Sequence, residues 1–266
     1  MSWREAEEAF RKSDTVILPT GTLHAHGPTP ISIDSGSSQK LADEVGRRTG
    51  LMVLPVISYG ENEKMKVYPA TIGISPDVLE AFYIDICRSL HRNGVRKVLV
   101  INGHGPNRDI LMRVGRKIRT YRMLMAVVEW WDIGTKTMPD LFPTADVFKQ
   151  ELAMAIAIGG KEVADIGRGV YRGEWGMTQF KKIFGDNIKP LGFDNFKYKE
   201  GPVTIPVDAW DIELENPPEI RKDELEGLKE QGQEILKRCA DYIAEFAKEF
   251  EKIDVEKSLG SGHAPS

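Results

Sequence analysis

The sequence of 266 residues is poor in cysteine and histidine, has no large excess of either charge and contains no long apolar run. Two cysteines exclude a small disulfide-stapled scaffold and favour free thiols in a reducing compartment, so we expect a cytoplasmic protein. With 36 Lys+Arg against 40 Asp+Glu, the net charge of −4 creates no basic field that would attract nucleic acid or a membrane surface. No apolar run approaches the ~20 residues of a membrane helix. The N-terminus is charged and lacks the apolar region of a secretory signal, so we do not expect it to be one.

Apolar runs alternate with helical patterns along most of the chain. Runs rich in Val, Ile and Leu without polar alternation predict strands that are buried on both faces, as in a parallel sheet. These runs are 15–21, 51–60, 97–103 and 123–132, and helical patterns cover 37–48, 76–93, 107–122, 147–158 and 217–251. We therefore predict an α/β fold, a single three-layer α/β/α sandwich over residues 1–266 with a mainly parallel sheet. Residues 159–218 are predicted as long loops and 259–266 as a frayed tail.

Three of the five histidines follow the ends of predicted strands. His24 and His26 alternate in an extended segment, so their side chains share one face. Asp34 follows them, and His104 lies just after the third predicted strand. Ligand sites of α/β sheets lie outside the carboxyl ends of the strands. Imidazole and carboxylate ligands suit Zn, Mn, Fe or Co better than Ca or Mg, so these residues predict a transition-metal site.

Several motifs in this order resemble those of the creatininase family, the creatinine amidohydrolases. Residues 17–28 (ILPTGTLHAHGP) are similar to the opening motif of the family, which is followed by a metal-binding Asp. Residues 55–60 (PVISYG), 68–75 (YPATIGIS) and 102–107 (NGHGPN) resemble three further blocks, and 130–132 (WWD) takes the place of a Trp-containing strand end. The resemblance covers roughly residues 16–173. It implies a three-layer sandwich, a two-metal site and a homo-oligomer built from dimers, such as a hexamer.

The resemblance also implies a ligand set. Carried over residue by residue, His26, Asp34 and His104 match family ligands, with Asp34 as the residue that bridges two ions. His24 stands where the family has a glutamate, which replaces an anion with a neutral donor. Thr29 stands in place of a second family histidine, and the stretch that leads to Asp34 is one residue shorter than usual.

A later family motif supplies a catalytic histidine and an acidic residue. Residues 146–151 match it best, which puts Asp146 in place of the histidine and makes Glu151 a fifth metal ligand. The alternative for Glu151 is a solvated helix residue. Asp146 is the first candidate for the proton donor, and Glu129 and Asp132 are further candidates.

Two features are candidates for substrate binding. We expect the side chain of Trp131 to form an apolar wall over a small ring of the substrate. The alternative is that this side chain only packs at the end of the sheet. The Gly-rich stretch that begins at residue 168 is either a mobile lid or a surface loop. Its Arg168 and Arg172 are candidates for binding polar oxygens of the substrate.

The resemblance implies a metal-dependent hydrolase in which one or two divalent ions, Zn first and Mn, Fe or Co as alternatives, hold a hydroxide that attacks a small cyclic polar substrate. Family members cleave C–N bonds of creatinine, formamides or peptides, and one branch cleaves a C–C bond of a diketo-inositol (3-dehydro-scyllo-inosose) in inositol catabolism. The changes at positions 24 and 146 favour the diketone, because its enolate leaving group has less need of a protonating histidine. A cyclic amide or formamide hydrolase is the alternative, and a non-catalytic binding protein with a remodelled metal site is the second.

Overall fold

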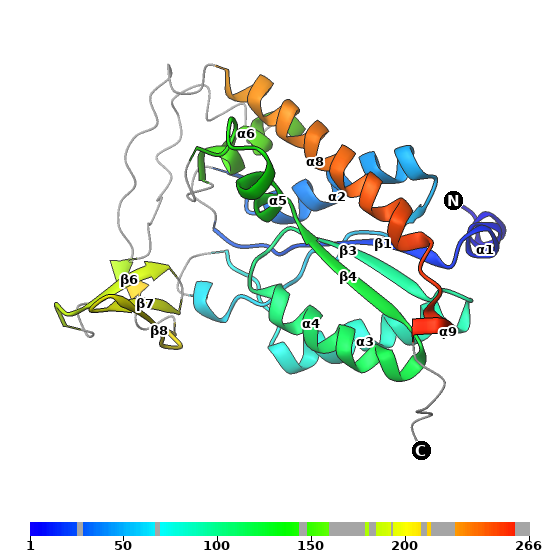
Figure 1. Cartoon of the computed structure of the whole chain (residues 1–266), viewed down its shortest axis with the longest axis horizontal. Coiled ribbons are helices and arrows are strands. Elements are labelled where there is room, and N and C mark those ends of the chain that lie inside the picture. Colours follow the sequence, from blue (N-terminus) through cyan, green and yellow to red (C-terminus); the bar gives the residue numbers. More distant parts are fainter. Residues whose placement is uncertain are drawn as a thin grey trace.

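The computed structural model describes residues 1–25, 29–66, 70–143, 148–159, 179–180, 185–192, 194–208, 212–213 and 227–258. The predicted site residues His26, Asp146, Arg168 and Arg172 lie outside these described residues, and so does the tail 259–266. The described elements, drawn in Figure 1, are α1 (Trp3–Lys12), β1 (Thr15–Thr20), α2 (Ile33–Thr49), β2 (Met52–Val53), η1 (Glu63–Met65), α3 (Pro76–Arg92), β3 (Lys97–Asn102), α4 (Asn107–Ile118), η2 (Arg119–Tyr121), β4 (Leu124–Glu129), α5 (Trp130–Thr137), α6 (Phe148–Ile158), β5 (Gln179–Phe180), β6 (Ile188–Gly192), β7 (Asn195–Tyr198), β8 (Gly201–Thr204), β9 (Ile212–Glu213), α8 (Leu228–Glu251) and α9 (Val255–Ser258).

Four parallel strands form the central sheet, in the order β2-β1-β3-β4. β1 pairs with β3 from Thr15 opposite Lys97 to Thr20 opposite Asn102. β3 then pairs with β4, which brings Asn102 opposite Glu129. The register therefore places Thr20, Asn102 and Glu129 in one row at the carboxyl end of the sheet, where adjacent side chains of one row point to the same face.

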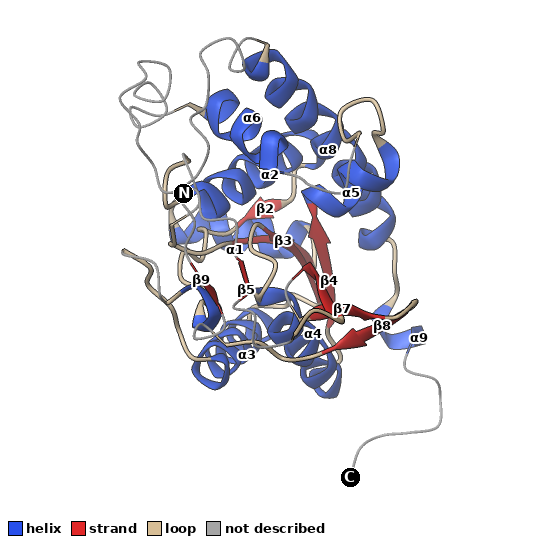
Figure 2. Ribbon diagram, turned by 90° about the vertical axis from the view of Figure 1, so that its left-hand side faces the viewer, coloured by secondary structure: helices blue, strands red, loops and turns tan. Residues whose placement is uncertain are grey.

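Helices cover both faces of this sheet, as Figures 1 and 2 show. Because side chains alternate along a strand, β1 and β3 contribute to two separate cores. Ile17 and Leu99 pack with α2, α5 and α8, whereas Val16 and Val98 pack with α3 and α4. The predicted α/β/α arrangement with a parallel sheet is thus confirmed.

Two element boundaries near the site differ from the sequence prediction. α2 begins at Ile33 rather than at residue 37, so Asp34 lies in the first turn of a helix and not in a loop. The hydroxyl of Ser35 donates to a main-chain carbonyl just after β1, at 3.1 Å, and this bond docks the first turn against the strand end. β4 ends at Glu129 and α5 begins at once at Trp130, so residues 130–132 are helical rather than extended.

Two longer segments also differ from the prediction. The expected strand over 51–60 pairs regularly only at Met52–Val53, and its contact with β1 resumes at Ile57 as an isolated bridge to Thr20. The expected loop over 159–218 is wrong where the structure describes it, since β6, β7 and β8 form a three-stranded antiparallel sheet. The residues of β8 are all exposed, so a buried apolar pattern does not mark that strand.

Cys87 and Cys239 are free thiols, each buried in a core. Burial raises the pKa of both thiols to about 12, which keeps them protonated and unreactive at neutral pH. In the described ranges, no helix combines the length and the apolar character that crossing a membrane requires.

Candidate metal centre

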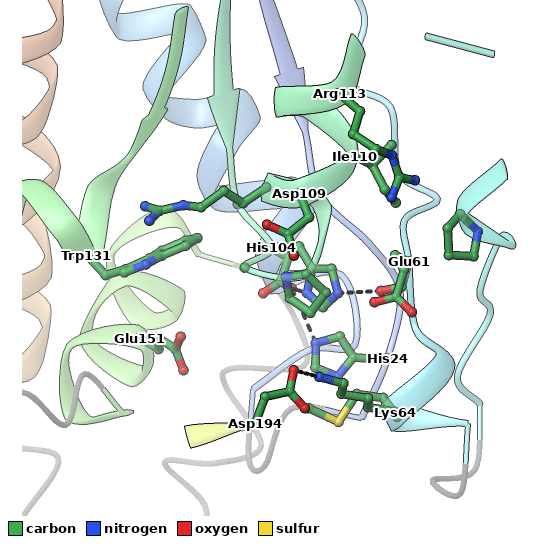
Figure 3. Close-up of a pocket in the computed structure, with 17 residues that line it drawn as sticks. His24, Glu61, Lys64, His104, Asp109, Ile110, Arg113, Trp131, Glu151 and Asp194 are labelled. Atoms are coloured by element: carbon green, nitrogen blue, oxygen red, sulfur yellow. Dashed lines mark hydrogen bonds and ion pairs between the residues drawn. The ribbon is translucent and has the colours of Figure 1, made fainter. Parts of the chain in front are cut away.

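His24, Asp34 and His104 meet at the carboxyl end of the sheet, as the sequence pattern predicts for these three residues. One nitrogen or oxygen atom from each lies within 4.8 Å of the others, and all three side chains are buried. Oδ2 of Asp34 is 2.9 Å from Nδ1 of His104 and 3.3 Å from Nε2 of His24. Figure 3 shows the two imidazole rings next to one another. Their centroids are 5.1 Å apart and their planes are tilted by 54°.

Two glycines allow the main chain at Asp34 to approach the strand ends. A Cβ on Gly103 would overlap the carbonyl oxygen of Asp34, and a Cβ on Gly21 would overlap the peptide that follows Asp34. Any larger residue at either position must push the first turn of α2 away from the sheet. The location of the Asp34 carboxylate is therefore set by main-chain contact with both strand ends.

The segment that carries His24 is held in an extended form by hydrogen bonds to its backbone. The N–H of His24 donates to the carbonyl of Ile31 at 3.1 Å, and Leu23 forms an antiparallel bridge with Ile72. The amide Nδ2 of Asn62 donates to the carbonyl oxygens of both Leu23 and Ile72, at 3.3 and 2.9 Å. None of these bonds uses the imidazole of His24.

The hydrogen bonds of His104 determine which ring nitrogen can act as a ligand. Nε2 lies 2.7 Å from the carbonyl oxygen of Glu61, and a carbonyl only accepts, so Nε2 carries the proton. Nδ1 of a neutral ring then presents a lone pair to the Asp34 carboxylate, and two lone pairs at 2.9 Å repel unless a cation or a proton is shared between them. A histidine that ligates through one nitrogen commonly donates from the other to a carbonyl or carboxylate. The residues present thus fit Zn or Mn, which take imidazole and carboxylate donors.

A cavity of about 650 Å³ opens over this centre. Trp131 from α5 and Glu151 from α6 both line it, on the same side in Figure 3. Glu151 is half-buried and lines the cavity, so the ligand role and the solvated alternative both stay predictions. On another side, Lys64 of η1 forms an ion pair with Asp194, which lies between β6 and β7. This pair ties the antiparallel sheet to the rim of the cavity.

Glu129 and Asp132, the further candidates for the proton donor, both accept hydrogen bonds from Nη2 of Arg108. The buried carboxylate of Glu129 also accepts a hydrogen bond from Nδ2 of Asn102 at 2.7 Å. The two side chains are close because Asn102 and Glu129 lie opposite one another on β3 and β4. Burial raises the pKa of Glu129, against the lowering effect of the bonds from Arg108 and Asn102. Among the described lining residues of the cavity, Arg108 appears and the two carboxylates do not. A role for either carboxylate in proton transfer stays a prediction.

Reasoning from the sequence missed Glu61 and Arg108. Glu61 acts on His104 through its main-chain carbonyl, and residue type gives no signal of that contact. Arg108 directly follows the motif at 102–107, so its position next to a strand end and its charge could have indicated a place in the cavity wall.

Comparison with known proteins identifies the family of this chain. The family model described as "Creatininase: Creatinine amidohydrolase" matches residues 1–156. The chain belongs to the creatininase family. Its curated relatives include the creatinine amidohydrolase of Pseudomonas putida, 27% identical over 146 residues that cover 50% of this chain and 56% of that protein. They also include the 3-dehydro-scyllo-inosose hydrolase of Thermotoga maritima, 26% identical over 107 residues that cover 40% of this chain and 34% of that protein.

The matches therefore span about half the length of one curated relative and about a third of the other. Solved structures of the creatininase family share the fold over a much larger part of the chain. A creatinine amidohydrolase (creatininase) superposes with a TM-score of 0.65 at 21% identity, covering 96% of this chain and 97% of that one. A manganese form, "Creatininase Mn", has a TM-score of 0.69 at 20% identity and covers 95% and 97%. A creatininase mutant described as Zn-Zn type gives the same TM-score, identity and coverage.

Proposed function

We propose that this chain is a metal-dependent hydrolase that opens a small cyclic carbonyl substrate, with the diketo-inositol 3-dehydro-scyllo-inosose as the preferred one. The observation that carries the proposal is the buried cluster of His24, Asp34 and His104 in the wall of a cavity of about 650 Å³. Small-molecule sites have volumes of about 300–1,000 Å³, so one six-membered ring is accommodated. Membership of the creatininase family supports hydrolysis as the reaction class.

The chain contributes ligands, orientation and shape. Asp34, His24 and His104 would hold a divalent ion, and such an ion activates water and polarises a carbonyl when it is bound. The bond from His104 to the carbonyl of Glu61 fixes the ring so that Nδ1 faces the carboxylate of Asp34 and would be the ligand nitrogen. We propose His26 and Glu151 as the additional ligands that a second ion requires.

The remaining roles concern the substrate and the proton. We propose that Trp131 forms an apolar wall against the ring, and that Arg168 and Arg172 bind substrate oxygens. Asp146 is proposed as the group that delivers the proton, in the place where the family has a histidine.

Opening a cyclic β-diketone needs one water and no other reactant. Oxygen from the water bonds to one carbonyl carbon, and the bond from that carbon to the carbon between the two carbonyls breaks. The electron pair moves to the latter carbon, where the second carbonyl stabilises it as an enolate, and a proton completes a ring-opened keto acid. A carbon leaving group of this kind has less need of strong protonation than an amine, which agrees with a carboxylate at position 146.

The second candidate is a cyclic amide hydrolase that acts on a creatinine-like lactam. The observation in its favour is the longer match to the creatinine amidohydrolase, 146 residues against 107 for the inosose hydrolase. In that reaction water attacks an amide carbonyl, and the leaving nitrogen must gain a proton.

The test is turnover by the metal-loaded protein, followed by NMR for ring-opened products. We expect 3-dehydro-scyllo-inosose to give a keto acid faster than creatinine gives creatine. Turnover of lactams without turnover of the diketone would reverse the order of the two candidates. A protein that binds metal but hydrolyses neither class would support a non-catalytic binding role instead.

A further inference from the structure

An ion-paired group of three side chains lies beside the metal centre, on neighbouring elements. Glu129 is the last residue of β4, Asp132 lies in the first turn of α5, and Arg108 lies in the first turn of α4. Nη2 of Arg108 donates to both carboxylates. The side chain of Glu129 is 2% exposed, whereas that of Arg108 is 49% exposed and lines the cavity.

The position of Arg108 is coupled to that of the metal centre through Asn102. Oδ1 of Asn102 accepts from the main-chain N–H of His104 at 3.2 Å, and Nδ2 donates to the carbonyl of the same residue at 2.7 Å. Nδ2 also donates to Glu129, whose other oxygen accepts from Arg108. One buried amide therefore orients both the loop that carries His104 and the carboxylate that holds Arg108.

Arg108 keeps donors that can reach a molecule in the cavity. A guanidinium has five N–H groups. The contacts of Arg108 within the described part of the chain are made by Nη2. Nε and Nη1 can therefore donate to an oxygen of a bound molecule without breaking either ion pair.

The charges around Arg108 select the kind of molecule. Glu129 and Asp132 both offset the charge of the one guanidinium, so an anionic ligand gains little by approaching it. An uncharged ring that carries hydroxyl and carbonyl oxygens can accept from Nε and Nη1 at no such cost. Trp131 also lines the cavity and offers an aromatic surface for the C–H faces of the ring.

We propose that Arg108 is a substrate-binding residue that reads the oxygen atoms of an uncharged polyhydroxylated ring, with Glu129 and Asp132 as positioning residues that hold its guanidinium. The inference rests on the proposed function, because it concerns the substrate of the same site. It assigns the preference for an oxygen-rich ring over a creatinine-like ring to one side chain.

The first experiment measures binding without chemistry. Metal-loaded protein is titrated with myo-inositol, a stable polyol ring, and with creatinine, and NMR saturation transfer and calorimetry follow the binding. We expect Arg108→Met to weaken binding of myo-inositol about tenfold to a hundredfold, the loss of hydrogen bonds from a charged donor. Arg108→Lys keeps the positive charge but loses the planar guanidinium with its several N–H donors. Its affinity for myo-inositol should therefore lie between that of the unaltered protein and that of Arg108→Met.

The matched control is Lys136→Ala. Lys136 is the other cation near Asp132, at 3.8 Å, but it is 74% exposed and is not among the described lining residues of the cavity. Its removal should leave the affinity for myo-inositol within about twofold. Because Arg108→Met leaves the buried Glu129 uncompensated, the double variant Arg108→Met/Glu129→Gln is the second form to test. Metal content should equal that of the unaltered protein in every variant.

The second experiment separates this inference from the proposed function. With 3-dehydro-scyllo-inosose as substrate, Arg108→Met should raise KM about tenfold or more while kcat changes much less. If the unaltered protein hydrolyses the diketone and the variants keep its KM and their affinity for myo-inositol, the role of Arg108 is wrong and the proposed function stands. If the unaltered protein binds myo-inositol through Arg108 but hydrolyses no diketone, the binding role stands and the proposed function fails. Absence of myo-inositol binding to the unaltered protein overturns the inference.

Discussion

Nδ1 of His104 lies 2.9 Å from the carboxylate of Asp34, while Nε2 of the same ring is fixed by the carbonyl oxygen of Glu61. This relationship leaves the ligand nitrogen facing an anion, an arrangement that a divalent ion stabilises. Loading with Zn or Mn should therefore stabilise the fold, by about 2.7 kcal/mol when free metal is about 100 times its Kd. For a chain of this size the melting temperature should rise by roughly 5–10 °C.

Asp34→Asn and His104→Ala should abolish that rise, whereas His91→Gln, which changes a histidine of α3 far from the centre in sequence, should retain it. The measurement is thermal melting of chelated and metal-loaded protein, with metal content by elemental analysis. An equal rise in the Asp34→Asn protein would show that the ion binds elsewhere.

Position 24 controls the charge of the centre. His24→Glu would place a second buried carboxylate beside Asp34, and like charges at this distance repel strongly in a buried site. We expect the metal-free variant to melt lower than the unaltered protein, and the affinity for a divalent ion to rise by about tenfold or more, equal to about 1.4 kcal/mol. His24→Gln adds no charge and should weaken the affinity instead. Competition with a chromogenic chelator measures both, and a weaker affinity in His24→Glu would contradict the electrostatic argument.

Gly103 lies against the carbonyl oxygen of Asp34, so Gly103→Ala must displace the first turn of α2. Overpacking of this kind costs typically about 1–3 kcal/mol, and we expect the variant to lose both stability and metal. Gly105→Ala is the matched control, because no atom lies within 4 Å of a Cβ placed there. Urea unfolding and metal analysis of the two variants would compare them directly. Equal behaviour would show that main-chain contact does not position Asp34.

Burial raises the pKa of Glu129 above its ordinary value of 4.5. A carboxyl group whose folded pKa is raised contributes stability below its unfolded pKa and loses that contribution as pH rises through the folded pKa. The free energy of unfolding of the unaltered protein, minus that of Glu129→Gln, should therefore fall as pH rises above about 4.5. Melts of chelated protein over this range test the sign. A difference that stays constant or rises over this range would contradict the argument.

The layers of the fold could be predicted because the strands at 15–20 and 97–102 are buried and mostly apolar, and that at 124–129 is apolar and half-buried. The motif residues at the strand ends carry imidazole and carboxylate groups. The convergence of His24 and His104 with Asp34 follows from the same pattern. The early start of α2 could not be predicted, since it depends on a bond from Ser35 to the main chain after β1. β8 could not be predicted either, because all its residues are exposed and its sequence lacks the alternation of apolar and polar residues that a half-buried strand shows.

Contacts made by the main chain explain most of what the sequence could not reveal at the site. The carbonyl of Glu61 orients His104, and Gly103 receives the carbonyl of Asp34. In both cases the atom that matters belongs to the backbone, and its direction depends on tertiary packing. The ion pairs of Arg108 likewise depend on the register that brings Asn102 opposite Glu129.

The backbone around His24 is held by hydrogen bonds that do not involve its imidazole. They are the bond from the N–H of His24 to the carbonyl of Ile31, the bridge between Leu23 and Ile72, and the bonds from the amide of Asn62 to the carbonyls of that bridge. The scaffold therefore separates the placing of this position from the choice of its side chain. An acid in place of the imidazole would be carried by the same backbone, but its charge would lower the stability of the metal-free fold and change the affinity of the pocket for ions. A single substitution at position 24 would therefore change the charge presented to an ion while the surrounding main chain stays in place.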